Sequence, residues 1–146
     1  MKTHLLFLAI LFVSLLNSSA QNSEDGTQRL AISGGTRWQT YPDQNKILIE
    51  VGRVTYNGSS NSGTVKIVVW ATTTPYQPGT KGWALGEYRL GVMQPRHYNY
   101  NIRQTVPYTR PPVGHYYVSI LVQEYNSSGG WRTQAFTKGT RSMEFR

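Results

Sequence analysis

The 146-residue chain contains no cysteine. Disulfide bonds, thiolate nucleophiles and zinc–thiolate sites are therefore excluded. Carboxylates are scarce, because seven Asp and Glu residues stand against 15 Lys and Arg, which gives a formal net charge of +8 at pH 7. Charged residues make up only 15% and aromatic residues 12% of the chain, a composition that favours a folded domain over a disordered one.

The first 20 residues have the three-part pattern of a secretory signal peptide. A positively charged start precedes an apolar run from Leu5 to Leu16, and Ser18 and Ala20 are small residues at the −3 and −1 positions of a cleavage site. As a helix the run covers about 18 Å, short of the roughly 30 Å hydrocarbon core of a bilayer. We therefore expect a signal peptide at residues 1–20, no transmembrane segment, and secretion to the periplasm or out of the cell.

After a polar tail at residues 21–26, apolar residues recur with a period of two. The clearest run is His115 to Tyr125, in which alternate residues from Tyr116 to Glu124 share one face. Similar runs recur roughly every 10–15 residues between Gly, Pro and Asn turns, and no segment has the period of an amphipathic helix. We expect residues 27–146 to form one all-β domain, an antiparallel sandwich of about seven to nine strands, with a small closed barrel as the alternative.

Glycines interrupt the strand pattern at two places. Gly34-Gly35 follows a first short strand that begins at Leu30, and it is expected to end that strand. In the next strand Gly52 shifts the alternation by one residue, so that Val51 and Val54 share a face. An extra residue at a glycine within a strand indicates a β-bulge.

From Gly63 onward, turn residues and aromatic residues follow a recognisable order. The residues are Gly63-Thr64, Trp70-Ala71, Pro75-Tyr76, Leu90-Gly91, Tyr98, Tyr100, Asn101-Ile102, Val106-Pro107, Pro111-Pro112, Gly114, Tyr116 and Glu124-Tyr125-Asn126. This order resembles the immunoglobulin-like, CARDB-like β-sandwich modules of secreted bacterial proteins, from which the turns Gln77-Pro78-Gly79 and Pro95-Arg96-His97 depart. The resemblance implies an immunoglobulin-like sandwich that acts as a non-catalytic accessory or adhesion-type domain, with no catalytic residues to carry over.

Residues for catalysis are few and scattered. The chain has no H-E-x-x-H or G-x-S-x-G motif and no phosphate-binding glycine loop, and after the signal peptide its only histidines are His97 and His115. No cluster of carboxylates suits a calcium ion. We therefore expect no enzymatic activity, no cofactor and no metal site. One alternative is a small hydrolase or lyase that uses Glu124 with a neighbouring Tyr or Arg, and Glu87 could meet Glu124 across neighbouring strands.

Aromatic and basic residues are the candidates for binding. Trp70 is expected in the core, whereas aromatic residues in loops are expected to be exposed, where a ring can stack on a sugar. Outward-pointing arginines in the basic C-terminal half would attract an anionic surface. The predicted ligand-binding residues are Tyr76, Trp83, Tyr108, Arg103, Arg110 and Arg132.

The sequence as a whole predicts a secreted, non-catalytic binding or adhesion-type module. Its expected partners are an acidic polysaccharide, lipopolysaccharide or an envelope protein. Nucleic acid is not expected, because the chain is exported and carries no recognition helix or RNA-binding signature. The alternative is a structural or assembly partner that pairs an edge strand with a larger envelope protein.

Overall fold

The computed structural model describes residues 28–146. The expected signal peptide, residues 1–20, and the polar tail, residues 21–26, lie outside this range. Within residues 28–146 no helix is long and apolar enough to cross a membrane.

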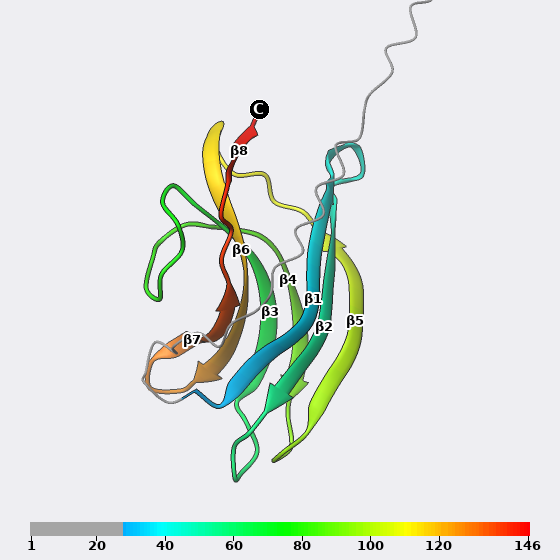
Figure 1. The fold of residues 1–146 in the computed structure, drawn as a ribbon, viewed down its shortest axis with the longest axis vertical. Coiled ribbons are helices and arrows are strands. Elements are labelled where there is room, and N and C mark those ends of the chain that lie inside the picture. Colours follow the sequence, from blue (N-terminus) through cyan, green and yellow to red (C-terminus); the bar gives the residue numbers. More distant parts are fainter. Residues whose placement is uncertain (1–27) are drawn as a thin grey trace, which may run out of the picture.

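The described residues form eight β-strands and one short 3₁₀ turn at Pro42–Gln44 (Figure 1). The strands are β1 (Leu30–Tyr41), β2 (Lys46–Tyr56), β3 (Thr64–Thr72), β4 (Trp83–Val92), β5 (Tyr98–Pro107), β6 (Gly114–Asn126), β7 (Gly130–Thr137) and β8 (Ser142–Phe145). All the strand pairs are antiparallel. The strand number falls within the range that the sequence predicts.

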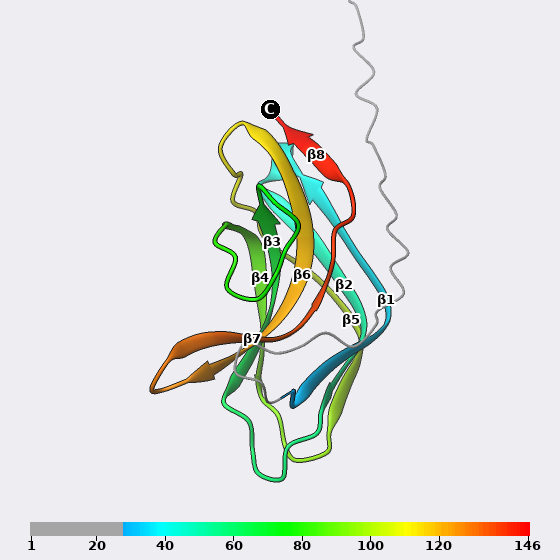
Figure 2. The same ribbon diagram turned by 60° about the vertical axis from the view of Figure 1, so that its left-hand side comes forward.

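The strands form two sheets that face each other. Sheet A has the order β1-β2-β5, and sheet B has the order β4-β3-β6-β7, with β8 also paired to β6. Figure 2 shows that β7 and β8 occupy successive lengths of one edge of β6, which agrees with their pairing partners in β6. The two separate sheets confirm the antiparallel sandwich rather than the closed barrel.

The main core lies between the sheets, where alternate residues of each strand point inward. The alternation predicted for β6 is confirmed, since Tyr116, Val118, Ile120 and Val122 are all buried in this core. Removing such side chains from water is the largest favourable contribution to folding. In sheet B the neighbouring strand β3 adds Val65, Ile67 and Val69, and from sheet A the strand β2 faces them with Ile47, Ile49 and Val51.

A row of irregular residues crosses sheet A. Gly34 and Gly35 of β1 lie opposite Gly52 of β2, and Gly52 lies opposite Asn101 of β5. The predicted bulge at Gly52 is therefore present, but the extra residue belongs to β1, and Gly34-Gly35 does not end the first strand. Gly34 stays within the strand because its φ of 76° is accessible to glycine. In Figure 1 the lower ends of β1, β2 and β5 turn away from the direction of their upper parts.

The connection from β5 to β6 is fixed by a tyrosine. Tyr116 Oη donates a hydrogen bond to the carbonyl oxygen of Pro112 at 2.8 Å. Its ring packs edge-on against Trp83 and Phe145, with centroids 5.2 Å and 5.7 Å away. This contact anchors the segment that carries the chain from sheet A to sheet B.

Candidate ligand-binding surface

The six residues predicted from the sequence do not form one surface. Trp83, Tyr108 and Arg110 lie near the end of the sandwich where β6 begins, and Thr109 N donates to Leu85 O there at 2.9 Å. The other three lie on different elements: Arg103 is on β5 in sheet A, Arg132 is on β7 in sheet B, and Tyr76 is in the β3–β4 loop.

Tyr76 is buried, contrary to the prediction that it is exposed. Only 2% of it is accessible, its ring packs edge-on against Phe136 at 4.9 Å, and its Oη lies 3.0 Å from Thr133 Oγ1. The β3–β4 loop thereby covers the outer face of sheet B, where Val68 and Leu121 form a second apolar cluster with Tyr76 and Phe136. The loop is needed there because the central strands are apolar on both faces.

Trp70 belongs to this second cluster, not to the main core as predicted. It is partly buried against the cluster, and its Nε1 donates to Thr80 O at 3.3 Å. Trp70 lies on the outer face of sheet B because its neighbours along the strand, Val69 and Ala71, take the inward positions. The indole therefore holds the loop over the sheet.

Trp83 is 40% exposed, as predicted, whereas Tyr108 is half-buried against the core. Burial raises the pKa of the Tyr108 phenol, and the neighbouring Arg110 guanidinium opposes this shift. Arg110 also donates to the backbone oxygen of Arg146 at 3.1 Å. At this end the aromatic rings mainly seal the sandwich.

A hydrogen bond from Arg146 to Glu144 lies at the same end. It holds the pKa of the Glu144 carboxyl below its usual range, with a further contribution from the positive charge of Arg146. Both groups are solvent-exposed, so salt screens the pair. These basic side chains therefore already have partners within the chain.

Tyr98 and Tyr100 are the large aromatic residues that sequence reasoning missed as a site. They are 51% and 63% exposed, and their ring centroids are 5.9 Å apart. Both lie on the outer face of sheet A, paired with Thr55 and Arg53 of β2. The Arg53 guanidinium carbon lies 4.4 Å from the centre of the Tyr98 ring, a cation–π distance.

The outward direction of the two tyrosines follows from Asn101. Strict alternation would put Tyr98 and Tyr100 on the same face as Ile102, which is buried. Asn101 has a φ of 51°, in the left-handed region that Asn tolerates better than most residues, and it reverses the alternation. The sequence held one sign that these tyrosines are exposed. Few residues of β5 are apolar, as expected for a strand at the edge of a sheet.

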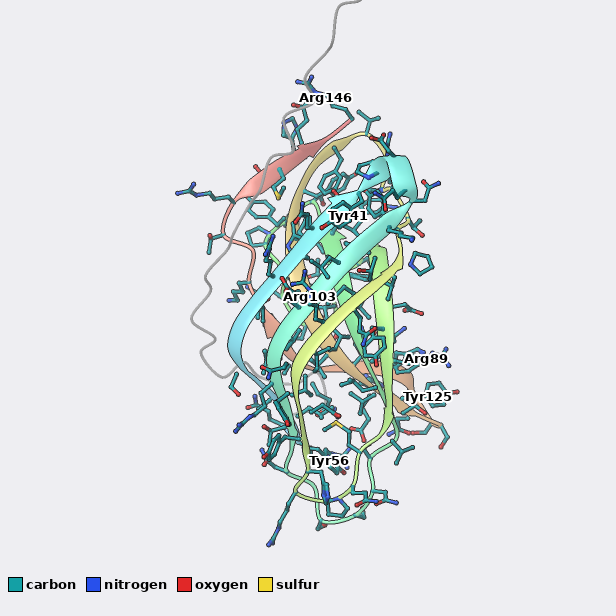
Figure 3. The ribbon with its side chains drawn as sticks, turned by 90° about the vertical axis from the view of Figure 1, so that its right-hand side faces the viewer. Tyr41, Tyr56, Arg89, Arg103, Tyr125 and Arg146 are labelled. Atoms are coloured by element: carbon teal, nitrogen blue, oxygen red, sulfur yellow. The ribbon has the colours of Figure 1, made fainter. Side chains whose placement is uncertain are left out.

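A row of charges crosses the same face above the tyrosines. Arg37, Glu50 and Arg103 are cross-strand neighbours on β1, β2 and β5. Arg37 Nη1 lies 3.5 Å from Glu50 Oε2, and Arg103 Nη1 donates to Glu50 Oε1. Figure 3 looks onto this face, with Arg103 near its centre. We call Arg37, Glu50, Arg53, Tyr98, Tyr100 and Arg103 the sheet A surface.

A second aromatic and basic cluster lies on the outer face of sheet B, but its members contact one another. The Lys66 ammonium lies 4.1 Å from the centre of the Trp131 ring and 2.7 Å from Glu87 Oε2. Tyr125 packs edge-on against Trp131 at 5.4 Å, and Arg89 lies 5.7 Å from the same ring. Because Lys66 is buried and paired, this cluster offers less free charge than the sheet A surface.

Glu124, the one catalytic candidate from sequence, is a buried structural carboxylate. It accepts hydrogen bonds from Gly63 N at 2.9 Å and from Arg29 Nη2 at 3.1 Å. Glu124 lies on the inner side of sheet B, whereas Glu87 is ion-paired to Lys66 on the outer side. The two carboxylates therefore do not meet, contrary to the possibility left open by the sequence.

The two histidines do not form a cluster with Glu124 in the described part of the chain. His115 and Glu124 are nine residues apart on β6, about 30 Å at 3.3 Å per residue. His97 is exposed in the β4–β5 turn, with Nδ1 2.9 Å from Pro95 O. Across residues 28–146, no group of three or more His, Asp and Glu residues is placed to hold a metal ion.

No family model matches this chain, and neither a curated protein nor a solved structure matches it. Function must therefore be inferred from the fold and from the surfaces of the chain itself. Among those surfaces, the sheet A surface combines exposed aromatic rings with cations that keep most of their donors free.

Proposed function

We propose that this protein is a secreted, non-catalytic binding module that holds a glycan of the cell envelope or the extracellular space on the sheet A surface. The observation that carries the proposal is the adjacent exposed pair Tyr98 and Tyr100, with Arg53 stacked on Tyr98. A tyrosine offers an apolar ring and a polar hydroxyl, which match the C–H face and the hydroxyl groups of a sugar. Arg103 is the one residue of the sequence-predicted set that belongs to this surface.

We further propose that the module is immunoglobulin-like and related to CARDB-like domains. The strand order supports this: with β1, β2 and β5 as strands A, B and E, and β3, β6 and β7 as C, F and G, each sheet has the immunoglobulin order. In the constant-type immunoglobulin fold a fourth strand, D, lies beside strand E. Here β4 lies beside β3, the counterpart of strand C, rather than beside β5, the counterpart of strand E. The hydrogen bond from Tyr116 at the start of β6 has the form of the tyrosine corner found in such domains.

The edges of the sheets give the assembly alternative less support. β1 is bulged at Gly34-Gly35, β4 has two shifts in its register with β3, and β7 has one in its register with β6. On β5, Asn101 breaks the extended conformation. Bulges twist an edge strand away and interrupt the row of free backbone groups that an added strand would use. A face is therefore a better candidate than an edge.

The test is the double substitution of Tyr98 and Tyr100 by alanine. Binding to immobilised polysaccharides is expected to weaken tenfold or more, because each aromatic contact contributes about 0.5–1.5 kcal/mol. Both side chains are about half exposed or more, so the melting temperature should change little. Affinity gel electrophoresis against a panel of neutral and acidic polysaccharides measures the binding.

Tyr125→Ala is the matched control, since Tyr125 is a 46% exposed tyrosine on the other sheet. It should leave binding unchanged. Unaltered binding by the double variant, or an equal loss in Tyr125→Ala, would contradict the assignment to the sheet A surface. Depolymerisation of any polysaccharide by the pure protein would contradict the non-catalytic role.

A further inference from the structure

We infer that the ligand of the sheet A surface is an acidic polysaccharide whose carboxylates bind the arginines beside Glu50. The inference rests on the proposed function, and it adds the chemical class of the ligand. It starts from the arrangement of Arg37 and Arg103, which flank a single carboxylate on a sheet face that is open to solvent.

Glu50 uses only a small part of the donor capacity of the two arginines. Together the two guanidinium groups carry about ten N–H donors. Arg37 gives one to Gln39 Oε1 at 3.0 Å, and its Nε is buried, so the donors open to a ligand are those at the ends of the two guanidinium groups. The Arg103 side chain is 65% exposed. The row therefore keeps a net positive charge and donors that face outward.

The row already shows which anion it fits. Glu50 lies between the two guanidinium groups with one carboxylate oxygen toward each. Guanidinium groups bind carboxylates and phosphates alike through two parallel N–H···O bonds. The preference for a carboxylate rests on Glu50, whose carboxylate already lies between these two groups. We therefore favour a carboxylate-bearing ligand over a phosphate or sulfate polymer.

The exposed tyrosine rings and the Arg103 guanidinium lie along the same strand, β5. This linear arrangement favours a polymeric ligand over a single sugar. Tyr100 and Arg103 are three residues apart on β5, about 10 Å at 3.4 Å per residue. Arg53, the cross-strand partner of Tyr100 on β2, adds a third cation beside the rings. An extended chain of acidic sugars can stack on the tyrosines and place a later carboxylate at Arg103.

Glu50 would compete with the carboxylates of such a ligand for Arg37 and Arg103. Replacing it with glutamine removes the one carboxylate of the row and leaves both arginines to the ligand. We expect Glu50→Gln to tighten binding about three- to tenfold, and Arg103→Gln to weaken it by a similar factor, as for a hydrogen bond between charged groups at an exposed site. An increase in affinity from Glu50→Gln is not expected of a residue with a purely structural role.

The experiment compares polygalacturonate with its fully methyl-esterified form, which has the same sugars without the charge. The wild-type protein should bind polygalacturonate more tightly, and added salt should reduce this preference. Arg103→Gln should weaken binding to polygalacturonate and leave binding to the ester unchanged. Arg141→Gln, which removes an exposed arginine outside the surface, should behave like the wild type.

The outcomes separate this inference from the proposed function. If the ester binds as tightly as the acid and still needs Tyr98 and Tyr100, the carboxylate inference is wrong and glycan binding stands. If neither form nor any neutral polysaccharide binds, the proposed function fails. Tighter binding to dextran sulfate, or to a 20-residue oligothymidylate, than to polygalacturonate would overturn the inference in favour of a sulfated glycan or a single-stranded nucleic acid.

Discussion

Replacing Tyr76 with alanine is expected to lower the free energy of unfolding by about 3–4 kcal/mol, the usual loss when a buried aromatic ring is removed. Tyr76 is 2% exposed and fills the second apolar cluster together with Val68, Leu121 and Phe136. Without the ring, the β3–β4 loop loses its main apolar contact, and the outer faces of β3 and β6 open to water. Urea denaturation followed by tryptophan fluorescence measures the change.

Tyr76→Phe is the matched control, because it keeps the ring and removes only the hydroxyl beside Thr133 Oγ1. It should cost about 1 kcal/mol, as for one buried hydrogen bond. The contrast between the two variants isolates the packing contribution of the ring. A loss below 1 kcal/mol for Tyr76→Ala would show that the loop does not cover a second core in solution.

Replacing Gly63 with alanine is expected to destabilise the fold by about 3 kcal/mol, at the upper end of the cost of overpacking. A Cβ on Gly63 would overlap the carbonyl oxygen of Tyr125, which is backbone and cannot rotate away. The displacement would also pull Gly63 N from Glu124 Oε1, now 2.9 Å away. The buried carboxylate would then lose one of its partners.

Gly35→Ala tests the opposite case. A Cβ there meets nothing within 4 Å, and its φ is not in the left-handed region. Its stability should stay within about 0.5 kcal/mol of the wild type, as for most surface substitutions. Equal losses for the two variants in thermal denaturation would mean that the contact of Gly63 with β6 is not what makes that glycine necessary.

The fold could be predicted because it depends on a local pattern. Alternation from Tyr116 to Glu124 fixes which side of β6 faces the core, and the apolar residues at both faces of β3 and β6 indicate central strands. These signals need only neighbouring residues and the two-residue period of a strand. The burial of Tyr76 could not be predicted, because it depends on the β3–β4 loop folding onto a face built by β3 and β6. These two strands are far from each other in the sequence.

The sheet A surface could not be predicted for a related reason. One residue in the left-handed conformation, Asn101, decides that Tyr98 and Tyr100 point outward while Ile102 points inward. The row of Arg37, Glu50 and Arg103 joins the consecutive strands β1 and β2 with β5, which is far from both in the sequence. Register across a sheet, unlike alternation within a strand, is set by non-local pairing.

The stacking of Arg53 on Tyr98 bears on how the sheet A surface would bind. Two contacting side chains on neighbouring strands hold each other in place, so less conformational entropy is lost when a ligand arrives. The aromatic and basic cluster around Trp131 shows the same kind of contact, but one of its two cations, Lys66, is already buried and paired. The difference between the two faces is therefore in the charge left available to a partner.

The most direct test of the central claim is a chemical-shift map of the isotope-labelled protein titrated with a short oligogalacturonate. The backbone amides of Tyr98, Tyr100 and Arg103 on β5, and of Arg53 on β2, should shift together and saturably. Shifts confined to Trp131 and its neighbours on sheet B, or to the end of the sandwich around Trp83, would contradict the assignment of binding to sheet A.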